Sequence, residues 1–342
     1  MTSSQKIKKI AIITGGGDCP GLNATIRAVV QTATREYGIS VVGIPNGFKG
    51  LLENKFIPLD LTNTTGIFSK GGTILGSSNV DTPFAVPVVR EGQKIFEDRS
   101  DEVIGHLKEE RVDALIVVGG DGTQSISHRL ALKGVKVVGI PKTIDNDLNG
   151  TEFTIGFFTA VATAVDALDR LHTTAESHHR IMVVEVMGRN AGWIALFAGL
   201  GGDADAILIP EIPYDLEKVA AHLNDLYHSR KSYSIVVVAE GAKPVGGDVT
   251  VKQVIEDSPE KLRLGGISQR VAPELERLTG QETRSIVLGH LLRGGSPEGF
   301  DRILAGRFGV AAVKAVVQGR FDTLVSYRND TVDLVPLETG AG

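Results

Sequence analysis

Two acidic turns, each directly after a run of apolar residues, contain the side chains best suited to chemistry. They are Gly119–Thr123 and Pro141–Asp147, and each preceding run is typical of a buried β-strand. Glycine at the carboxyl end of a strand lets a phosphate chain lie against the backbone. The carboxylates of Asp121 and Asp145 would repel phosphate, so they suit a bridging divalent cation or a base that takes a proton from a hydroxyl. Together the two turns indicate phosphoryl transfer onto an alcohol.

A third glycine turn, at Gly15–Asp18, and the pair Asp145 and Asp147 also have simpler interpretations. Gly15–Asp18 follows the first apolar run, where its glycines could admit a phosphate or form an ordinary strand-to-helix turn. No Gly-Lys-Ser/Thr follows, so it is not a P-loop. Asp145 and Asp147 could cap a helix or form an Asx turn. Their place at a second strand end favours a ligand site instead.

Four arginines stand beside glycine or histidine turns near predicted strand ends, at Arg180, Arg189, Arg284 and Arg293. The planar guanidinium group binds phosphate through paired donors. One such arginine is usually a solvated surface group, but four in this setting favour a pocket for a phosphate ester. Glu240 follows another apolar run, where it could bind a sugar hydroxyl or simply end a strand.

The overall composition predicts a cytoplasmic enzyme. The net charge of -5 argues against general nucleic-acid binding. No apolar run approaches the ~20 residues of a membrane span, and no signal-type apolar block follows the polar start. Cys19 is the only cysteine, which excludes an intrachain disulfide and suits a reducing compartment. Without a cysteine set or an HExxH helix, a zinc site at His178, His179 and His290 is disfavoured.

Short apolar runs alternate with segments of helical periodicity, which predicts an α/β protein with parallel sheets covered by helices, and two sheets rather than one. The predicted strands are 10–13, 40–44, 114–118, 136–140, 181–186, 206–209, 234–239 and 285–288, the last with Arg284 just before it. The predicted helices are 23–36, 101–110, 124–133, 154–174, 193–199 and 215–230. Residues 243–263 are polar, which predicts a surface excursion with room for one short helix.

Eight motifs in a fixed order, between about Lys9 and about Gly319, resemble those of the 6-phosphofructokinase family. They are Gly-Gly-Asp-Cys-Pro-Gly-Leu-Asn at 16–23, Gly-Gly-Thr-Ile-Leu-Gly-Ser at 71–77, Gly-Gly-Asp-Gly-Thr at 119–123, Pro-Lys-Thr-Ile-Asp-Asn-Asp at 141–147, Thr-Ile-Gly-Phe-Phe-Thr-Ala at 154–160, Val-Glu-Val-Met-Gly-Arg at 184–189, Glu-Thr-Arg-Ser-Ile-Val-Leu-Gly-His at 282–290 and Arg-Gly-Gly-Ser-Pro at 293–297. So many motifs in the family's order make chance agreement negligible.

The resemblance implies two similar three-layer α/β/α lobes with mainly parallel sheets and an active site in the cleft between them. Residues 1–155 with roughly 295–325 would form the nucleotide-binding lobe, and 156–294, with the excursion at 243–263, the sugar-phosphate lobe. The implied glycolytic reaction transfers the γ-phosphoryl group of ATP, with Mg²⁺, to the 1-hydroxyl of fructose 6-phosphate, giving fructose 1,6-bisphosphate and ADP.

The resemblance also implies a role for each motif residue. Asp145 would be the general base, Asp121 the magnesium partner, and Thr143 and Arg189 would flank the transferring group. The implied nucleotide site comprises Gly16, Ser78, Asn79, Gly120, Asp121, Gly122, Thr123 and Lys142. The implied sugar-phosphate site comprises Thr143, Ile144, Asp145, Met187, Gly188, Arg189, Glu240, His290, Leu291, Leu292, Arg293, Arg180 and Arg284. The last two reach in from a neighbouring subunit in the family, which implies a homo-oligomer, usually a tetramer.

Three departures from the family pattern concern the donor and regulation. Pyrophosphate-using members typically carry Asp at the position of Gly122 and Lys at that of Lys142, whereas many bacterial nucleotide-using members carry Gly at both. Gly122 leaves space for an α-phosphate, so ATP is the expected donor and pyrophosphate the alternative. Asn79 replaces an arginine that bridges two phosphates in many ATP-dependent members, and Lys142 could supply that charge. The effector cluster of well-known bacterial enzymes is only partly present, so its allosteric control is not implied: Arg27 matches, whereas Gln31, Lys55 and His172 replace arginines.

Two other classes of protein explain less of the sequence. Lipid and NAD kinases share the Gly-Gly-Asp-Gly-Thr loop, but that loop leaves Thr143–Asp147 and Met187–Arg189 unexplained. A non-catalytic nucleotide sensor on this fold would have lost its base, and Asp145 is present. Tight binding of fructose 6-phosphate without turnover would favour the sensor.

Overall fold

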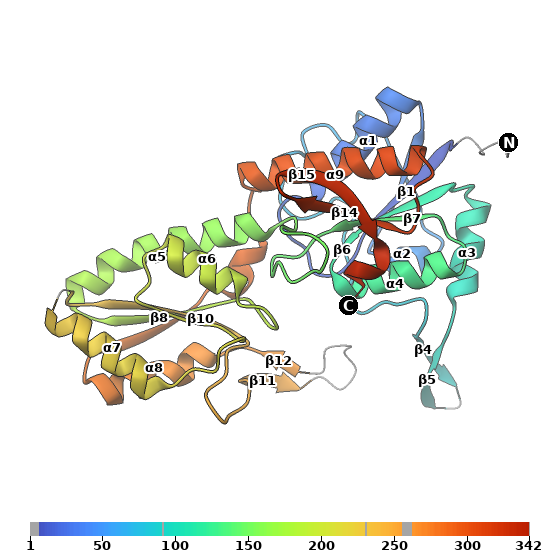
Figure 1. The fold of residues 1–342 in the computed structure, drawn as a ribbon. Coiled ribbons are helices and arrows are strands. Elements are labelled where there is room, and N and C mark those ends of the chain that lie inside the picture. The colour runs from blue at the N-terminus through green and yellow to red at the C-terminus, as the bar shows by residue number, and fades with distance from the viewer. Residues whose placement is uncertain (1–6, 91, 230, 255–261, 342) are drawn as a thin grey trace. The chain divides into compact units, whose positions relative to one another are not determined.

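The chain divides into two compact units in the computed structural model, which describes residues 7–90, 92–229, 231–254 and 262–341 (Figure 1). The first unit contains the described residues up to Thr143, then Leu148–Gly156, and those from Gly294 onward. The second contains Ile144–Asp147 and the described residues of Phe157–Arg293. Each unit has its own sheet with helices on both faces, so the prediction of an α/β fold with mainly parallel sheets is confirmed.

The sheet of the first unit is parallel except at its edges. Its strands are β1 (Lys9–Thr14), β2 (Ser40–Ile44), β3 (Ile57–Leu59), β6 (Ala114–Gly119), β7 (Val137–Pro141), β14 (Thr323–Arg328) and β15 (Thr331–Pro336). In the described residues these seven strands follow the order β15-β14-β7-β6-β1-β2-β3. β3 and β15 join antiparallel, and the strands between them are parallel. Every residue of β6 and β7 is buried, as expected for central strands covered on both faces.

Two groups of helices cover this sheet. One face carries α1 (Leu22–Tyr37) and α9 (Gly299–Val317), which pack together; a methyl group on Gly309 would lie 2.7 Å from the Cβ atom of Ala28. The other elements of the unit are α2 (Phe48–Leu52), α3 (Ser100–Glu109), α4 (Asp121–Leu132), η2 (Leu337–Gly340) and the hairpin β4 (Val86–Arg90) with β5 (Gln93–Glu97). The core between the sheet and α2, α3 and α4 is apolar, and apart from Phe48 its buried residues are aliphatic.

The sheet of the second unit is parallel throughout. Its strands are β8 (Ile181–Val186), β9 (Ala206–Leu208), β10 (Ser234–Ala239) and β13 (Thr283–Val287), in the order β13-β8-β10-β9. The helices are α5 (Phe157–His178), α6 (Trp193–Gly201), α7 (Leu216–Ser229) and α8 (Ile267–Thr279), with the 3₁₀ turn η1 (Gly289–Arg293). In Figure 1, α5 and α6 cover one face of the sheet, and α7 and α8 cover the other. A small hairpin pairs β11 (Val251–Val254) with β12 (Leu262–Leu264).

The structure differs from the sequence prediction in the bounds of several elements. Helix α4 begins at Asp121, inside the predicted turn, and α5 begins at Phe157 instead of at residue 154. Arg284 lies within β13, so its placement before the strand was wrong. Within the predicted excursion at 243–263, the described residues contain β11 and the start of β12, and residues 255–261 lie outside the described part of the chain. The structure also contains elements that were not predicted: α2, β3, the β4–β5 hairpin, α8, α9 and the β14–β15 pair. Among the described residues, no helix combines the length and apolar character needed to cross a membrane.

Candidate functional site

Three of the predicted site turns meet at one edge of the first unit's sheet. β1, β6 and β7 are neighbouring parallel strands, so the residues that follow them emerge side by side. The amide of Gly15 donates to the carbonyl of Val118 at 2.9 Å, and the amide of Lys142 donates to the carbonyl of Gly119 at 3.1 Å. The glycine turns and the start of the Lys142–Asp147 segment are therefore joined by backbone hydrogen bonds.

Thr123 explains two of the glycines at this edge. It is 8% exposed, and a methyl group on Gly15 would lie 2.8 Å from its Cγ2 atom. A methyl group on Gly119 would clash with the same side chain. Gly122 is different, because a methyl group there would have no atom within 4 Å. Gly122 is thus not required by packing, and the space beside it is open.

Lys142 supplies a buried positive charge at this edge. Its side chain is 3% exposed, and its ammonium group donates to the carbonyl of Gly17. The same ammonium would be 3.4 Å from a methyl group on Gly16, whose φ of 76° favours glycine. The amide of Gly16 donates to the carbonyl of Ser78 at 3.1 Å, so the loop that carries Ser78 and the exposed Asn79 lies against this turn. Lysine and glycine amides together suit an anionic ligand.

Asp121 is exposed at the first residue of α4, and its Oδ1 atom accepts a hydrogen bond from the amide of Gly122 at 2.6 Å. The part of the chain that the structure describes has no group of three or more His, Cys, Asp or Glu side chains that could hold a metal. A cation at Asp121 would therefore need ligands from a bound phosphate and from water. Mg²⁺ often binds proteins in this way, through one or two carboxylates and substrate phosphates.

The segment that follows β7 has a fixed local conformation. The hydroxyl of Thr154 donates to the carbonyl of Thr143 at 2.6 Å. The side chain of Ile144 is 1% exposed, so only its backbone is available to a ligand. Asn146 has a φ of 53°, in the left-handed region that Asn tolerates better than most residues. This turn separates Asp145 from Asp147.

The second unit brings together another set of predicted residues at the carboxyl ends of β8, β10 and β13. Met187–Arg189 follows β8, Glu240 follows β10, and η1 contains His290–Arg293 after β13. The amide of Glu240 donates to the carbonyl of Val186 at 3.0 Å, which ties the first two turns together. Gly188 has a φ of 136°, and a methyl group on it would lie 2.7 Å from the carbonyl oxygen of Ala191.

Glu240 belongs to this set, and the pKa of its carboxyl group departs from the ordinary value of a glutamate. Burial raises the pKa of its carboxyl group, and the nearby charge of Glu185 raises it further, while Arg293 and Arg189 act in the opposite direction.

Within η1 the two leucines differ, since the side chain of Leu292 is fully buried and that of Leu291 is 67% exposed. Leu292 can therefore offer a ligand only its backbone.

Arg180 and Arg284 do not join this set. Arg180 precedes β8, and Arg284 is the second residue of β13, so both lie toward the amino ends of the strands. They flank one carboxylate: Arg180 Nε is 2.8 Å from Glu282 Oε2, and Arg284 pairs with Glu282 Oε1. A strand of six residues spans about 16–20 Å. These arginines are thus separated by the length of the sheet from Met187–Arg189.

Sequence reasoning assigned no role to Glu185, although this buried carboxylate lies near the carboxyl end of β8. It is 2% exposed within β8 and accepts three hydrogen bonds, from the amide of Gly266 at 2.8 Å, from the amide of Ser268 at 3.0 Å, and from the Ser268 hydroxyl at 2.9 Å. A carboxylate in an otherwise apolar strand was the available signal, since a buried charge needs partners.

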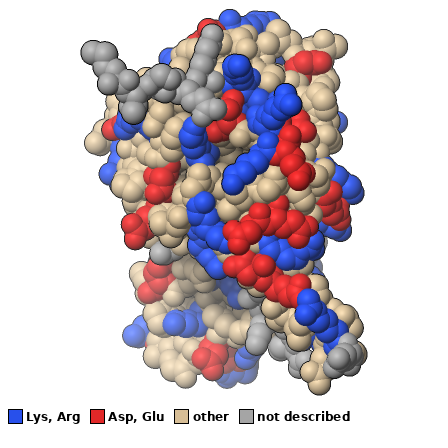
Figure 2. Space-filling model, turned by 90° about the vertical axis from the view of Figure 1, so that its right-hand side faces the viewer, with Lys and Arg blue, Asp and Glu red and all other residues tan. Residues whose placement is uncertain are grey.

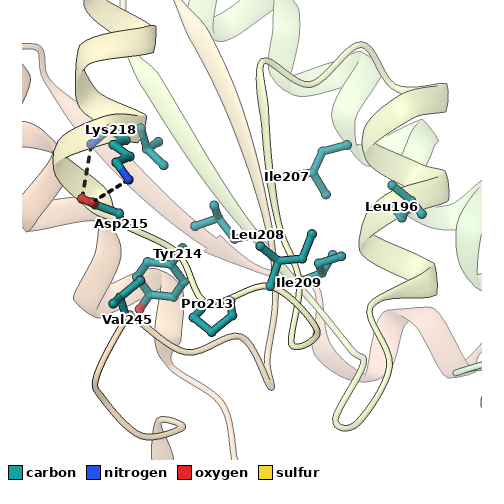
Figure 3. A pocket seen from close by; sticks show the side chains of 11 residues that line it. Leu196, Ile207, Leu208, Ile209, Pro213, Tyr214, Asp215, Lys218 and Val245 are labelled. Atoms are coloured by element: carbon teal, nitrogen blue, oxygen red, sulfur yellow. Dashed lines mark hydrogen bonds and ion pairs between the residues drawn. The ribbon is translucent and has the colours of Figure 1, made fainter.

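A separate pocket of about 400 Å³ lies in the second unit (Figure 3). Apolar side chains of α6, β9 and the segment before α7 line most of it, and Asp215 and Lys218 add a charged pair 3.6 Å apart. Its lining is Leu196, Ile207, Leu208, Ile209, Ile212, Pro213, Tyr214, Asp215, Lys218, Val219 and Val245. None of the predicted site residues is among them, so this pocket is not the candidate site.

The surface charge agrees with the modest net charge. On the face that Figure 2 shows, Lys and Arg side chains are interspersed with Asp and Glu side chains. This mixed face does not resemble the clustered basic surface that a general nucleic-acid binder presents.

Comparison with known proteins identifies the family of this chain. The phosphofructokinase family model matches residues 9–316, which is most of the chain. This chain therefore belongs to the phosphofructokinase family, and the predicted family membership is confirmed. It is a phosphofructokinase-type enzyme, with glycine turns at the strand ends of its first unit and charged turns at the strand ends of its second.

Individual relatives differ in the donor that their names state. An ATP-dependent 6-phosphofructokinase 2 of Clostridium perfringens is 52% identical over 99% of this chain and 93% of its own length. A pyrophosphate–fructose 6-phosphate 1-phosphotransferase of Streptomyces coelicolor is 48% identical over 96% of this chain and 93% of its own. Among solved structures, the phosphofructokinase of Pichia pastoris matches with a TM-score of 0.83 and 30% identity, over 99% of this chain. This chain spans only 36% of that much longer one.

Proposed function

We propose that this enzyme transfers the γ-phosphoryl group of MgATP to the 1-hydroxyl of fructose 6-phosphate. The observation that carries the choice of ATP is the open space beside Gly122 at the end of β6. An α-phosphate needs such space, whereas pyrophosphate does not. The 52% identical relative from Clostridium perfringens is named ATP-dependent, which supports the same choice.

The proposed roles follow from charge and position. Asp145 takes the proton of the attacking hydroxyl as general base, and Thr143 and Arg189 offset the charge of the transferring group. The backbone of Gly16 and of Gly120–Thr123, with Ser78, Asn79 and Lys142, binds the donor phosphates. Met187, Gly188, Glu240 and the His290–Arg293 turn, with the backbone of Ile144, bind the sugar phosphate. Most of the rate enhancement then comes from positioning and electrostatic stabilisation.

Mg²⁺ fits the donor set at the start of α4. Asp121 offers one exposed carboxylate there, beside the open space at Gly122. When bound, the ion would neutralise phosphate charge during transfer. Asp121 is the residue of this chain that would hold it, with the remaining ligands from the nucleotide and water.

We further propose that Arg180 and Arg284 bind the 6-phosphate in the site of a neighbouring subunit of a homo-oligomer, usually a tetramer in this family. Their location near the amino ends of β8 and β13 supports this, because the other sugar-phosphate residues follow the carboxyl ends. Their pairing with Glu282 keeps both guanidinium groups together at that edge.

Pyrophosphate is the second candidate donor. The buried ammonium of Lys142 at the Gly16–Gly17 turn favours it, because a shorter donor needs a fixed positive charge close to its phosphates. The Streptomyces coelicolor relative that is named for pyrophosphate supports this candidate at 48% identity.

A donor panel separates the two candidates. Initial rates are measured with fructose 6-phosphate and Mg²⁺ and with ATP, GTP, ADP or pyrophosphate at matched concentrations. The proposal expects the highest kcat/KM with ATP and little turnover with pyrophosphate. A higher kcat/KM with pyrophosphate would reverse the donor assignment and leave the acceptor unchanged.

A further inference from the structure

Arg189 is attached to the β11–β12 hairpin. Its Nη1 atom donates to the carbonyl oxygen of Leu262 at 2.9 Å. Leu262 is the first residue of β12, and β12 pairs with β11 alone among the described strands. An isolated two-stranded hairpin is only marginally stable in water. The position of the Leu262 carbonyl must therefore depend on what holds the ends of the hairpin.

Glu185 holds the end of β12 that leads into α8. Its carboxylate accepts hydrogen bonds from the amides of Gly266 and Ser268 and from the Ser268 hydroxyl, at 2.8–3.0 Å. Gly265 and Gly266 have φ values of 126° and 84°, which let β12 turn directly into the helix. A methyl group on Gly265 would lie 3.4 Å from Glu185 Oε1, so the turn packs against this carboxylate.

The fixed end of this connection is the central sheet of the second unit. Glu185 lies in β8, where it is paired with Val238 of β10 and with Val287 of β13. Its negative charge also suits the N-terminus of α8, where backbone amides carry a partial positive charge. Arg189 lies four positions after Glu185 in the sequence, just beyond the end of the same strand. Glu185 is therefore connected to the Arg189 guanidinium group through the start of α8 and through β12.

We propose that Glu185 is a positioning residue for phosphoryl transfer: it fixes the start of α8 and the adjoining β12, whose Leu262 carbonyl in turn orients Arg189. This inference rests on the proposed function, in which Arg189 offsets charge on the transferring group. Glu185 itself does not contact the reactants. Its contribution reaches the reaction through the hairpin and should therefore vanish when Arg189 is removed.

A double-mutant cycle tests this dependence. Glu185→Gln keeps the size of the side chain but replaces one acceptor oxygen by an NH₂ donor, so the three hydrogen bonds cannot all form. We expect kcat to fall about tenfold, since small misplacements of a positioned group are costly. In an Arg189→Ala background the same change should lower kcat by less than about twofold. Equal fold losses in both backgrounds would refute the proposal.

Two further variants separate positioning from general damage. Ser268→Ala removes one of the three hydrogen bonds and should give a smaller loss, about two- to threefold, that also disappears without Arg189. Asp205→Asn is the matched control: this half-buried carboxylate accepts from the Ile235 amide at 2.9 Å and pairs with Lys231, near the amino end of β10. It should lower the urea midpoint of unfolding yet leave kcat within about twofold. A comparable loss of kcat in Asp205→Asn would mean that Glu185 acts only through stability.

The remaining outcomes distinguish this inference from the proposed function. If Arg189→Ala keeps wild-type kcat, the proposed role of Arg189 is wrong, and this inference fails with it. If Arg189→Ala is strongly impaired but the cycle is additive, the inference alone fails. If the effect of Glu185→Gln disappears in a Glu240→Gln background instead, Glu185 acts through Glu240, which also overturns the proposal.

Discussion

Replacing Gly122 by Asp should change donor use without harming the fold. A side chain at this position has open space, because a methyl group there would have no atom within 4 Å. The residue is the second of α4, where a carboxylate is favourable by about 0.3–1 kcal/mol and where glycine is a poor helix former. Gly122→Asp should therefore unfold at the same or a slightly higher urea concentration than the wild type.

The effect on ATP use follows from Coulomb's law. A carboxylate about 4 Å from an α-phosphate charge, at an effective dielectric constant of 20, is repelled by roughly 4 kcal/mol. Water and a bound cation screen much of this, and a quarter of it, about 1 kcal/mol, lowers kcat/KM about fivefold. Gly122→Asn provides the matched control, because it has nearly the same size and no charge.

The assay is kcat/KM for ATP and for pyrophosphate in the wild type and both variants. The expected order for ATP is wild type, then Asn, then Asp, with the Asp variant at least about fivefold below the wild type. Pyrophosphate use should fall less in Gly122→Asp. An unchanged kcat/KM for ATP in a folded Gly122→Asp protein would show that no donor phosphate lies beside this residue.

Three other outcomes are expected. Asp145→Asn should lower kcat by roughly 10²–10⁴-fold while the KM for fructose 6-phosphate changes much less, and near wild-type kcat in steady-state assays would remove it as the base. Arg180→Ala and Arg284→Ala should each weaken fructose 6-phosphate binding by about 1.5–3 kcal/mol, and should weaken donor binding less. Mixing Arg180→Ala subunits with Asp145→Asn subunits should restore activity. If no activity returns although the subunits have been shown to exchange, Arg180 acts in the site of its own subunit. Burial and the charge of Glu185 raise the pKa of Glu240, so the folded state binds this proton more tightly than the unfolded state does. The contribution of Glu240 to the free energy of unfolding therefore falls as the pH rises above about 4.3, the ordinary pKa of a glutamate. Glu240→Gln should remove this part of the pH dependence in urea unfolding, and identical pH profiles would contradict it.

The central strands could be predicted because their sequences are continuous apolar runs. β6, β7, β8 and β10 are buried on every residue, so period and length identified them. α9 could not be predicted in the same way, since apolar side chains occur all around it. It packs beside α1 on one face of the sheet and contacts β7 and β14, a tertiary arrangement that no local pattern encodes.

The glycine and acidic turns of the candidate site were also visible in the sequence, because each follows a strand. What the sequence could not supply is register. Arg284 reads as a residue beside a strand, but β13 begins at Thr283 and aligns Arg284 with Met182 near the amino end of β8. The anchoring role of Glu185 depends on Gly266 and Ser268, which are some 80 positions away in sequence and meet it only in the fold.

The most direct test of the proposed function is a competition followed by ³¹P NMR. The enzyme receives fructose 6-phosphate, Mg²⁺, and equal concentrations of ATP and pyrophosphate in one tube. The proposal predicts that ATP is converted to ADP while a second phosphate ester appears on carbon 1 of the sugar and the pyrophosphate signal stays constant. Consumption of pyrophosphate before ATP, or the absence of a second ester with either donor, would contradict it.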